Sequence, residues 1–318
     1  MPTEFETIAQ YFAHGFPNRS DVILGIGDDA ALCTVPAGKQ LVISVDTLVG
    51  DVHFPLTTAP EDVGYKALAV NLSDMAAMGA TPAWVTLALT CPEINEHWLT
   101  GFTRGFAELA KRSHVSLIGG DTTKGTLTIT IQIIGFIPAG KALQRNGARV
   151  NDGIYVTGTL GDAGLGLASV KKQVTLPSWI KQVVEFRLHR PSPRLQEGQA
   201  LRDIANSAID ISDGLLADLG HILQASGVGA LIELDALPLS QALQQQLSLE
   251  QAWQFALTAG DDYELCFTVS PEKETQLQAV LAEGTFKRIG TIAHESGLRC
   301  IDSVGQLFET ELIGYQHF

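Results

Sequence analysis

Three segments in the first half of the chain have a pattern of hydrophobic and polar positions that predicts β-strands. Residues 41–45, 85–90 and 127–133 are rich in β-branched apolar side chains, and the last segment alternates strictly between apolar and polar positions. Such alternation is typical of a strand with one buried and one polar face, which favours a mixed or antiparallel sheet. Further strands are expected at residues 153–157, 208–211, 230–234 and 263–269.

Between these strands the apolar residues recur at helical spacing. Residues 60–78 begin with Pro-Glu-Asp, a favourable first turn, and end before Gly79. Residues 95–112 carry an apolar stripe, and another begins at Leu215, with Ser212 or Asp213 as the expected N-cap. Helices are also predicted over residues 243–257 and 272–282.

A polar, turn-rich and locally basic stretch at residues 138–152 interrupts the pattern. It predicts a boundary between two domains, residues 1–148 and 149–318. The length of 318 residues agrees with two domains, because domains average roughly 150 residues.

Charge and composition narrow the class of protein. With 21 basic and 35 acidic residues the net charge is −14, which argues against nucleic acid as a partner because that affinity comes mostly from Lys and Arg. Four cysteines lie in or beside apolar stretches without a C-x-x-C pair, so buried free thiols are expected. The acidic N-terminus does not resemble a signal peptide, and no apolar run reaches the ~18 residues of a membrane span. We therefore expect a cytoplasmic protein with no membrane partner.

Aspartates gather in short segments, mostly at the ends of predicted strands. The segments are residues 25–31, 43–47, 71–75, 119–123, 209–214 and 260–264. Strand ends commonly carry functional loops, and the small residues beside each acid allow a ligand to approach the backbone. Taken singly, each aspartate is equally compatible with a helix cap or an Asx-turn.

Asp74 is the most informative of these acids, because its predicted helix is small and apolar on nearly every side. An unpaired carboxylate there costs several kcal/mol, so a compensating group is expected. A basic side chain such as Lys66 and a bound metal ion are both compatible with the pattern.

The candidate ligands are all oxygen donors, and no cysteine or histidine cluster accompanies them. Scattered carboxylates suit Mg²⁺, which takes one or two of them together with waters and phosphate oxygens. Neither a G-x-x-x-x-G-K-[ST] loop nor a G-x-G-x-x-G loop is present. The glycine-rich residues 161–166 are therefore interpreted as a loop or helix start rather than a phosphate contact.

Seven motifs together resemble one known family. They are Gly-Ile-Gly-Asp-Asp (25–29), Ser-Val-Asp-Thr (44–47), His-Phe (53–54), Asn-Leu-Ser-Asp-Met-Ala-Ala-Met-Gly (71–79), Gly-Gly-Asp-Thr (119–122), Asp-Ile-Ser-Asp-Gly-Leu (210–215) and Asp-Tyr-Glu-Leu (262–265). In this order they resemble the thiamine-monophosphate kinase family, within a superfamily that includes aminoimidazole ribonucleotide synthetase. The similarity extends from Phe5 to residues 314–318.

The resemblance implies a fold and an activity. It implies an α/β N-terminal domain whose mixed sheet pairs across a homodimer, and an α+β C-terminal domain that completes the active site. The implied reaction is ATP-dependent phosphorylation of thiamine monophosphate to thiamine diphosphate, by direct in-line transfer assisted by several Mg²⁺ ions. Another kinase reaction on the same scaffold, a non-catalytic nucleotide-binding protein and a phosphate-releasing hydrolase are the alternatives.

The resemblance also implies roles for particular residues. The implied Mg²⁺ ligands are Asp29, Asp46, Thr47, Asp74, Asp121, Asp210 and Asp213. The implied ATP contacts are Ser44, Val45, Gly120, Asp121, Arg145 and Ser212. The implied contacts to thiamine monophosphate are His53, Asp261 and Tyr315. Asp261 and Tyr315 depart from the family pattern, which usually has Glu at the first position and often has Trp at the second.

Overall fold

The computed structural model describes residues 3–308, which divide into two compact units. Unit 1 holds residues up to 75 and residues 80–140, and unit 2 holds residues 76–79 and the chain from residue 141 onward. The division at residues 140 and 141 lies within the predicted turn-rich stretch, but it comes earlier than the expected boundary at residue 148. The short segment 76–79 was not expected to group with the second unit.

Unit 1 is built on a four-stranded mixed sheet with the strand order β3-β6-β4-β5. The strands are β3 (Lys39–Val49), β6 (Thr128–Pro138), β4 (Thr81–Cys91) and β5 (Ser116–Lys124). β6 is antiparallel to β3 and β4, whereas β4 and β5 are parallel. The three early strands predicted from their apolar pattern are therefore confirmed as β3, β4 and β6, which extend beyond the predicted limits.

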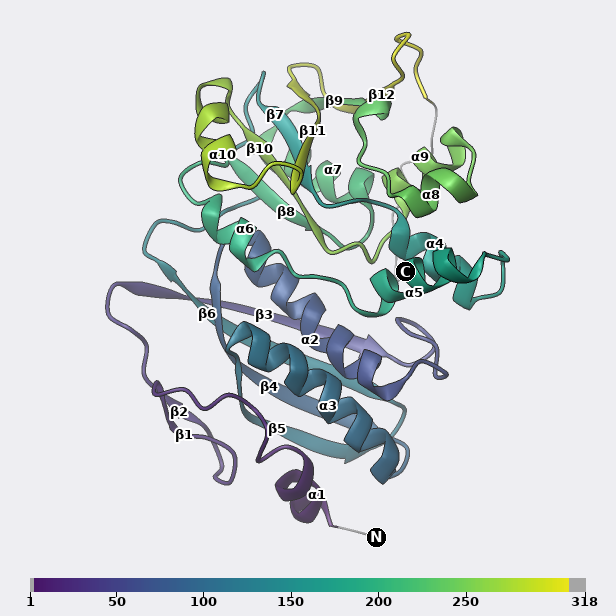
Figure 1. The fold of residues 1–318 in the computed structure, drawn as a ribbon. Helices are drawn as coiled ribbons and strands as arrows, with labels where there is room; N and C mark the ends of the chain where they lie inside the picture. Colours follow the sequence, from purple (N-terminus) through teal and green to yellow (C-terminus); the bar gives the residue numbers. More distant parts are fainter. Residues whose placement is uncertain (1–2, 309–318) are drawn as a thin grey trace. The chain divides into compact units, whose positions relative to one another are not determined.

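Two long helices cover one face of this sheet, as Figure 1 shows. They are α2 (Pro60–Ala77) and α3 (Glu96–Ser113). The covered face of β6 carries Ile129, Ile131 and Ile133, which are all buried. The α3 stripe, including Phe102 and Phe106, is buried as its spacing predicts. The core of unit 1 therefore lies between the helices and this face.

Three short elements complete unit 1. They are α1 (Glu4–Tyr11) and the two strands β1 (Val22–Leu24) and β2 (Leu32–Cys33), which form a small antiparallel sheet. The N-terminus of α1 has a capping box formed by Thr3 and Glu6. The segment between β1 and β2 contains Asp28 and Asp29, so these aspartates lie in a connection rather than within a strand.

Unit 2 contains a six-stranded sheet with the order β12-β9-β11-β7-β10-β8. The strands are β7 (Gly153–Thr157), β8 (Ser207–Ile211), β9 (Gly229–Glu233), β10 (Glu264–Val269), β11 (Phe286–Ala293) and β12 (Gly297–Ile301). β12 pairs with β9 in parallel, and all other neighbours are antiparallel. The four predicted later strands are confirmed, while β11 and β12 were not predicted.

Helices pack on both faces of the second sheet. α7 (Leu215–Ser226) packs against one face, where Ile154 and Cys266 are buried. α6 (Leu195–Ala200) and α10 (Glu274–Val280) pack against the other face, where Tyr155 and Phe267 are buried. A further cluster joins α4 (Asp162–Val170), α5 (Ser178–His189), α8 (Gln241–Gln246) and α9 (Leu249–Thr258). Two short 3₁₀ turns, Leu234–Ala236 and Pro271–Lys273, complete the unit.

Two details differ from expectation. The single helix predicted over residues 243–257 is two helices, because Ser248 caps α9 through a capping box with Gln251. All four cysteines are free thiols, and three are buried as predicted, but Cys33 is only half-buried. None of the helices in the described residues is long and apolar enough to cross a membrane.

Candidate active site

A cavity of about 690 Å³ in unit 1 is lined by residues of two sequence motifs, 25–29 and 119–122. It is bordered by α1, by the connection between β1 and β2, and by the adjacent strands β4 and β5. Asp28, Asp29, Gly120 and Asp121 line it. Sequence motifs separated by about 90 residues therefore meet at one place, with three carboxylates around a shared space.

Gly120 allows the backbone of β5 to approach β4 closely. A Cβ atom at this position would lie 1.9 Å from the carbonyl oxygen of Leu87, so any side chain would force the two strands apart. Glycine therefore gives the cavity a wall of bare backbone beside Asp121. Such a wall permits close approach of a bulky anionic ligand.

A second group of predicted residues lies on the helix-covered side of β3. Ser44 and Asp46 alternate with the exposed Ile43 and Val45, and the Ser44 hydroxyl donates a hydrogen bond to Asp74 Oδ2 on α2. The expected compensation of Asp74 thus includes a neighbouring hydroxyl, a group that the sequence analysis did not consider.

Thr47 and Asp121 lie on the opposite, open face of the same sheet. The cross-strand register places Thr47 beside Thr130, Thr130 beside Ala88, and Ala88 beside Asp121. The Thr47 and Thr130 hydroxyls are hydrogen-bonded at 2.9 Å. The predicted metal ligands of unit 1 are therefore distributed over two faces of the sheet rather than gathered on one.

The carboxylate groups of the structure can be compared with what a bound metal ion requires. Within residues 3–308, no three Asp, Glu, His or Cys side chains form a group that could hold a metal ion by themselves. The carboxylates at the unit 1 cavity are nevertheless hard oxygen donors beside an open space. This arrangement fits Mg²⁺, which keeps several waters and completes its octahedron with substrate phosphates.

Unit 2 brings other predicted residues together at the end of β8. Asp210 is buried near that end, and Ser212 and Asp213 follow it. The Asp261 backbone N–H donates to the Ser212 carbonyl at 2.8 Å, and the Tyr263 N–H donates to the Ile211 carbonyl at the same distance. The segments 210–214 and 260–264 are thus adjacent.

The start of α7 corrects the predicted helix cap. The N-cap residue is Gly214, which has a φ of 115° and provides no side-chain hydrogen bond. Asp218, inside the first turn, accepts hydrogen bonds from the backbone N–H groups of Ser212, Asp213 and Gly214. Burial raises the pKa of Asp218 to about 7, against the lowering effect of these bonds. Sequence reasoning missed Asp218 as a site-loop residue, although an acid in the first helical turn was a readable signal.

Behind this loop lies a buried ionic network. Glu264 is paired with Arg187 at 2.7 Å and with Arg194 at 2.5 Å, and it accepts a hydrogen bond from Thr157. Asp262 accepts from the Gly161 N–H, while its Oδ1 atom is buried without a hydrogen-bond partner. Burial raises the pKa of Asp262 well above its ordinary value. The Asp-Tyr-Glu motif thus belongs to the buried packing behind the loop.

The remaining predicted residues lie elsewhere. His53 follows β3, and its Nδ1 atom accepts a hydrogen bond from the Val49 N–H at 2.9 Å, so a neutral ring carries its proton on Nε2. Arg145 is exposed, and its carbonyl accepts from Ser226 at the far end of α7 from Ser212. Tyr315 lies outside the described residues.

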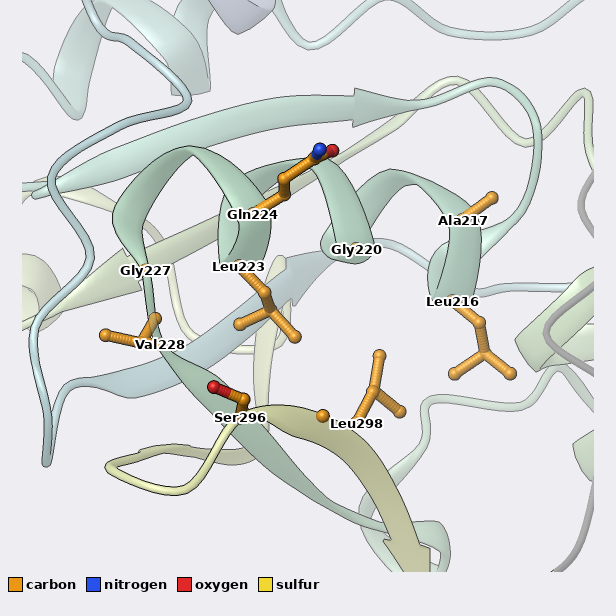
Figure 2. A pocket seen from close by; sticks show the side chains of 10 residues that line it. Leu216, Ala217, Gly220, Leu223, Gln224, Gly227, Val228, Ser296 and Leu298 are labelled. Carbon is orange, nitrogen blue, oxygen red and sulfur yellow. The ribbon is translucent and has the colours of Figure 1, made fainter.

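A second cavity, in unit 2, has a different character. It measures about 470 Å³ and lies between α7 and the start of β12. Figure 2 shows Leu216 and Leu223 extending from α7 toward the strand that carries Leu298. The lining residues carry no charged side chain and include no predicted site residue. Phosphate chemistry is therefore better supported at the acidic segments described above.

Comparison with known proteins identifies the class of this fold. Residues 27–137 match the family AIR synthase related protein, N-terminal domain, and residues 149–303 match the family AIR synthase related protein, C-terminal domain. The two-unit α/β and α+β architecture with its aspartate-bearing loops is thus that of an AIR synthase related protein.

Closer relatives define the family. Thiamine-monophosphate kinase of Escherichia coli (strain K12) is 48% identical over 318 residues, covering 99% of this chain and 98% of that protein. The chain belongs to the thiamine-monophosphate kinase family and is therefore a kinase.

Solved structures agree with this assignment. The crystal structure of thiamine-monophosphate kinase from Stenotrophomonas maltophilia K279a is 46% identical, with a TM-score of 0.84 over 89% of this chain and 92% of that one. The structure of AaThiL complexed with AMPPCP and TMP is 27% identical, with a TM-score of 0.79 over 99% of this chain and 94% of that one.

Proposed function

We propose that this protein transfers the terminal phosphate of ATP to thiamine monophosphate and releases thiamine diphosphate. The unit 1 cavity carries this proposal, because it joins three carboxylates to the bare backbone of Gly120. The relatives named as thiamine-monophosphate kinases, and the AaThiL complex with AMPPCP and TMP, support the same reaction.

Mg²⁺ is the proposed metal. Its proposed ligands are Asp29, Asp46, Thr47, Asp74 and Asp121 in unit 1, and Asp210 and Asp213 in unit 2. When bound, Mg²⁺ offsets the negative charge of the phosphate groups and orients them. The all-oxygen donor set and the exposure of Asp28, Asp29 and Asp121 at the cavity support this choice of metal.

The contacts to ATP and to thiamine monophosphate are proposed residue by residue. Ser44, Val45, Gly120, Asp121, Arg145 and Ser212 are the proposed ATP contacts, and His53, Asp261 and Tyr315 are the proposed contacts to thiamine monophosphate. The cavity position of Gly120 and Asp121 supports the first group. The hydrogen bond from the Val49 N–H to Nδ1 orients the His53 ring beside the end of β3.

The proposed transfer is direct and in line, without a phosphorylated enzyme. The attacking phosphate has a second pKa of about 6, so it is mostly dianionic at neutral pH and needs no general base. The attacking phosphate is repelled by the phosphates of ATP. Two unit charges ~4 Å apart repel by about 4 kcal/mol at an effective dielectric constant of about 20. The chain's task is therefore to bind both anions and hold them in line.

We further propose a cytoplasmic homodimer. The open face of β3 presents Leu41, Ile43 and Val45, which are between 45% and 58% exposed. These side chains form one continuous apolar row on a sheet face, and such rows usually mark interaction surfaces. A second copy of the same chain is the proposed occupant. The four free thiols are consistent with a reducing compartment.

One incubation tests the reaction. The protein is mixed with ATP, Mg²⁺ and thiamine monophosphate, and thiamine diphosphate and ADP are quantified by chromatography. We expect equal amounts of both products and no labelled protein after incubation with γ-labelled ATP. Free phosphate without thiamine diphosphate would instead indicate a hydrolase, and ATP binding without turnover would indicate a non-catalytic protein.

A further inference from the structure

Asp218 holds the backbone of the loop between β8 and α7. Its side chain is 3% exposed, and its Oδ2 atom accepts three hydrogen bonds. The donors are the backbone N–H groups of Ser212 at 3.0 Å, Asp213 at 3.0 Å and Gly214 at 3.1 Å. Three successive peptide groups are therefore directed at a single oxygen, which restricts the rotation of each of them.

This contact fixes the residues just before α7 and does not cap the first N–H groups of the helix itself. Gly214 occupies the N-cap position, but it has no side chain with which to accept the first N–H groups of α7. A Cβ atom at Gly214 would lie 2.8 Å from the Thr258 carbonyl oxygen, so a capping side chain does not fit there. Asp218 reaches back from the first turn of the helix and accepts from the N–H groups of the three residues that precede it, up to and including the N-cap residue.

The other side of the loop is fixed independently. The Ser212 carbonyl accepts a hydrogen bond from the Asp261 N–H, and the Ile211 carbonyl accepts one from the Tyr263 N–H. The Ser212 peptide unit is thus held on one side by the segment 261–263 and on the other by Asp218. With its backbone fixed in this way, the loop has few directions in which to present the side chains of Ser212 and Asp213.

We propose that Asp218 is a positioning residue for phosphoryl transfer, which orients Ser212 and Asp213 toward the nucleotide and its metal without touching either ligand. The proposal rests on the function proposed above. A displacement of about 1 Å in a positioning group can lower the reaction rate on the order of 100-fold. Loss of the Asp218 acceptor should therefore lower the catalytic rate as well as the stability of the fold.

The test compares D218A and D218N with a matched control, D152A. Asp152 is also a buried aspartate of unit 2, and its carboxylate accepts from the Arg149 N–H and from Asn206 Nδ2 at 2.9 Å. Both alanine variants lose a buried hydrogen-bonded carboxylate and should lose similar stability. We expect kcat/KM for ATP to fall by about 100-fold in D218A and to remain near the wild-type value in D152A.

The conservative variant D218N tests whether a hydrogen-bond acceptor at this position restores activity. Its amide oxygen can accept from the same N–H groups but lacks the charge that roughly doubles the strength of such bonds. We therefore expect D218N to recover most of the kcat/KM lost in D218A. Equal kcat/KM for D218A and D152A in folded protein would overturn the proposal, as would D218N behaving no better than D218A.

Amide hydrogen exchange separates this proposal from the proposed function. In the protein without ligands, the amides of residues 212–214 should be protected in wild type, and this protection should be lost in D218A but not in D152A. If wild type shows this protection but makes no thiamine diphosphate, the proposed function fails while the Asp218 contact stands. If these amides exchange equally fast in wild type and D218A, the positioning role is wrong, whatever the activity.

Discussion

The single side chain of Asp74 makes a structural contact and is also a proposed Mg²⁺ ligand. It accepts a hydrogen bond from Ser44, and this contact is local to α2 and β3. An asparagine at this position can still accept that hydrogen bond through its amide oxygen, but it carries no charge for a cation. Structure and chemistry can therefore be separated with one isosteric substitution.

We predict that D74N remains folded and loses activity. Because several kcal/mol of transition-state stabilisation is expected from each metal contact, kcat should fall by at least about 100-fold. Steady-state assays at saturating ATP and circular dichroism measure the two effects. E108Q removes the same charge from the exposed side of α3 and should leave both unchanged. An active D74N variant would remove Asp74 from the set of metal ligands.

Asp262 provides a prediction about pH. Burial raises its pKa, so the folded protein keeps a proton that the unfolded chain releases above about pH 4. The folded state therefore binds more protons, and its stability falls as pH rises toward the folded pKa. D262N mimics the neutral carboxyl group and should lose less stability than wild type as the pH rises above the ordinary carboxyl pKa of about 4 toward the raised pKa of folded Asp262. Urea denaturation of both proteins measures the difference, and parallel pH profiles would contradict the assignment.

Residues of the candidate site differ in how far sequence could predict them. Asp29 and Asp121 were identifiable because each stands in a short acidic segment with small residues beside it, and the cavity brings both together. Asp218 was not, because its role depends on three N–H groups that converge only when the loop closes over α7. The opposite faces of Asp46 and Thr47 follow from strand alternation, but the sequence pattern alone did not show which face the helices cover.

At the scale of elements, the crossing of α2 and α3 depends on glycine. A Cβ atom at Gly105 would lie 1.8 Å from the carbonyl oxygen of Glu61, and one at Gly64 would lie 2.0 Å from that of Phe102. The two helix backbones therefore approach more closely than any side chain permits. This close packing holds α2, and with it Asp74, against the sheet.

We predict that G105A destabilises unit 1 by about 1–3 kcal/mol or more, because the added methyl group forces the helices apart. G220A is the control, since Gly220 lies inside helix α7 and a Cβ atom added there would meet nothing within 4 Å. That variant should gain about 0.5–1 kcal/mol from the lower entropy of its unfolded chain. Thermal and urea denaturation give both values, and equal effects would contradict the close-approach argument.

Helices and strands were predictable where the hydrophobic periodicity was strong, but not where a helix cap divided a continuous apolar pattern. β6 and α3 follow from alternation and from an apolar stripe, and both are confirmed. The break between α8 and α9 was missed, because the apolar residues continue through it while Ser248 and Gln251 form a capping box. β12 was missed because it is a short edge strand with little alternation.

For the whole molecule, the open face of β3 leads to a prediction about assembly. Ile43 is 56% exposed on this face, and burying a row of such side chains between two copies stabilises a dimer by the hydrophobic effect. A charge placed there must be desolvated on association, so I43E should convert a wild-type dimer to a monomer. Val280, on α10 of unit 2, is also exposed, and V280E is the matched control that should remain dimeric. Sedimentation equilibrium measures the masses of the wild type, I43E and V280E. An I43E variant that remains dimeric would assign the apolar row to another partner.

The same variant tests whether association orders β3. If it does, loss of the dimer should also lower kcat/KM for ATP, because Ile43 is flanked on that strand by Ser44, a proposed ATP contact.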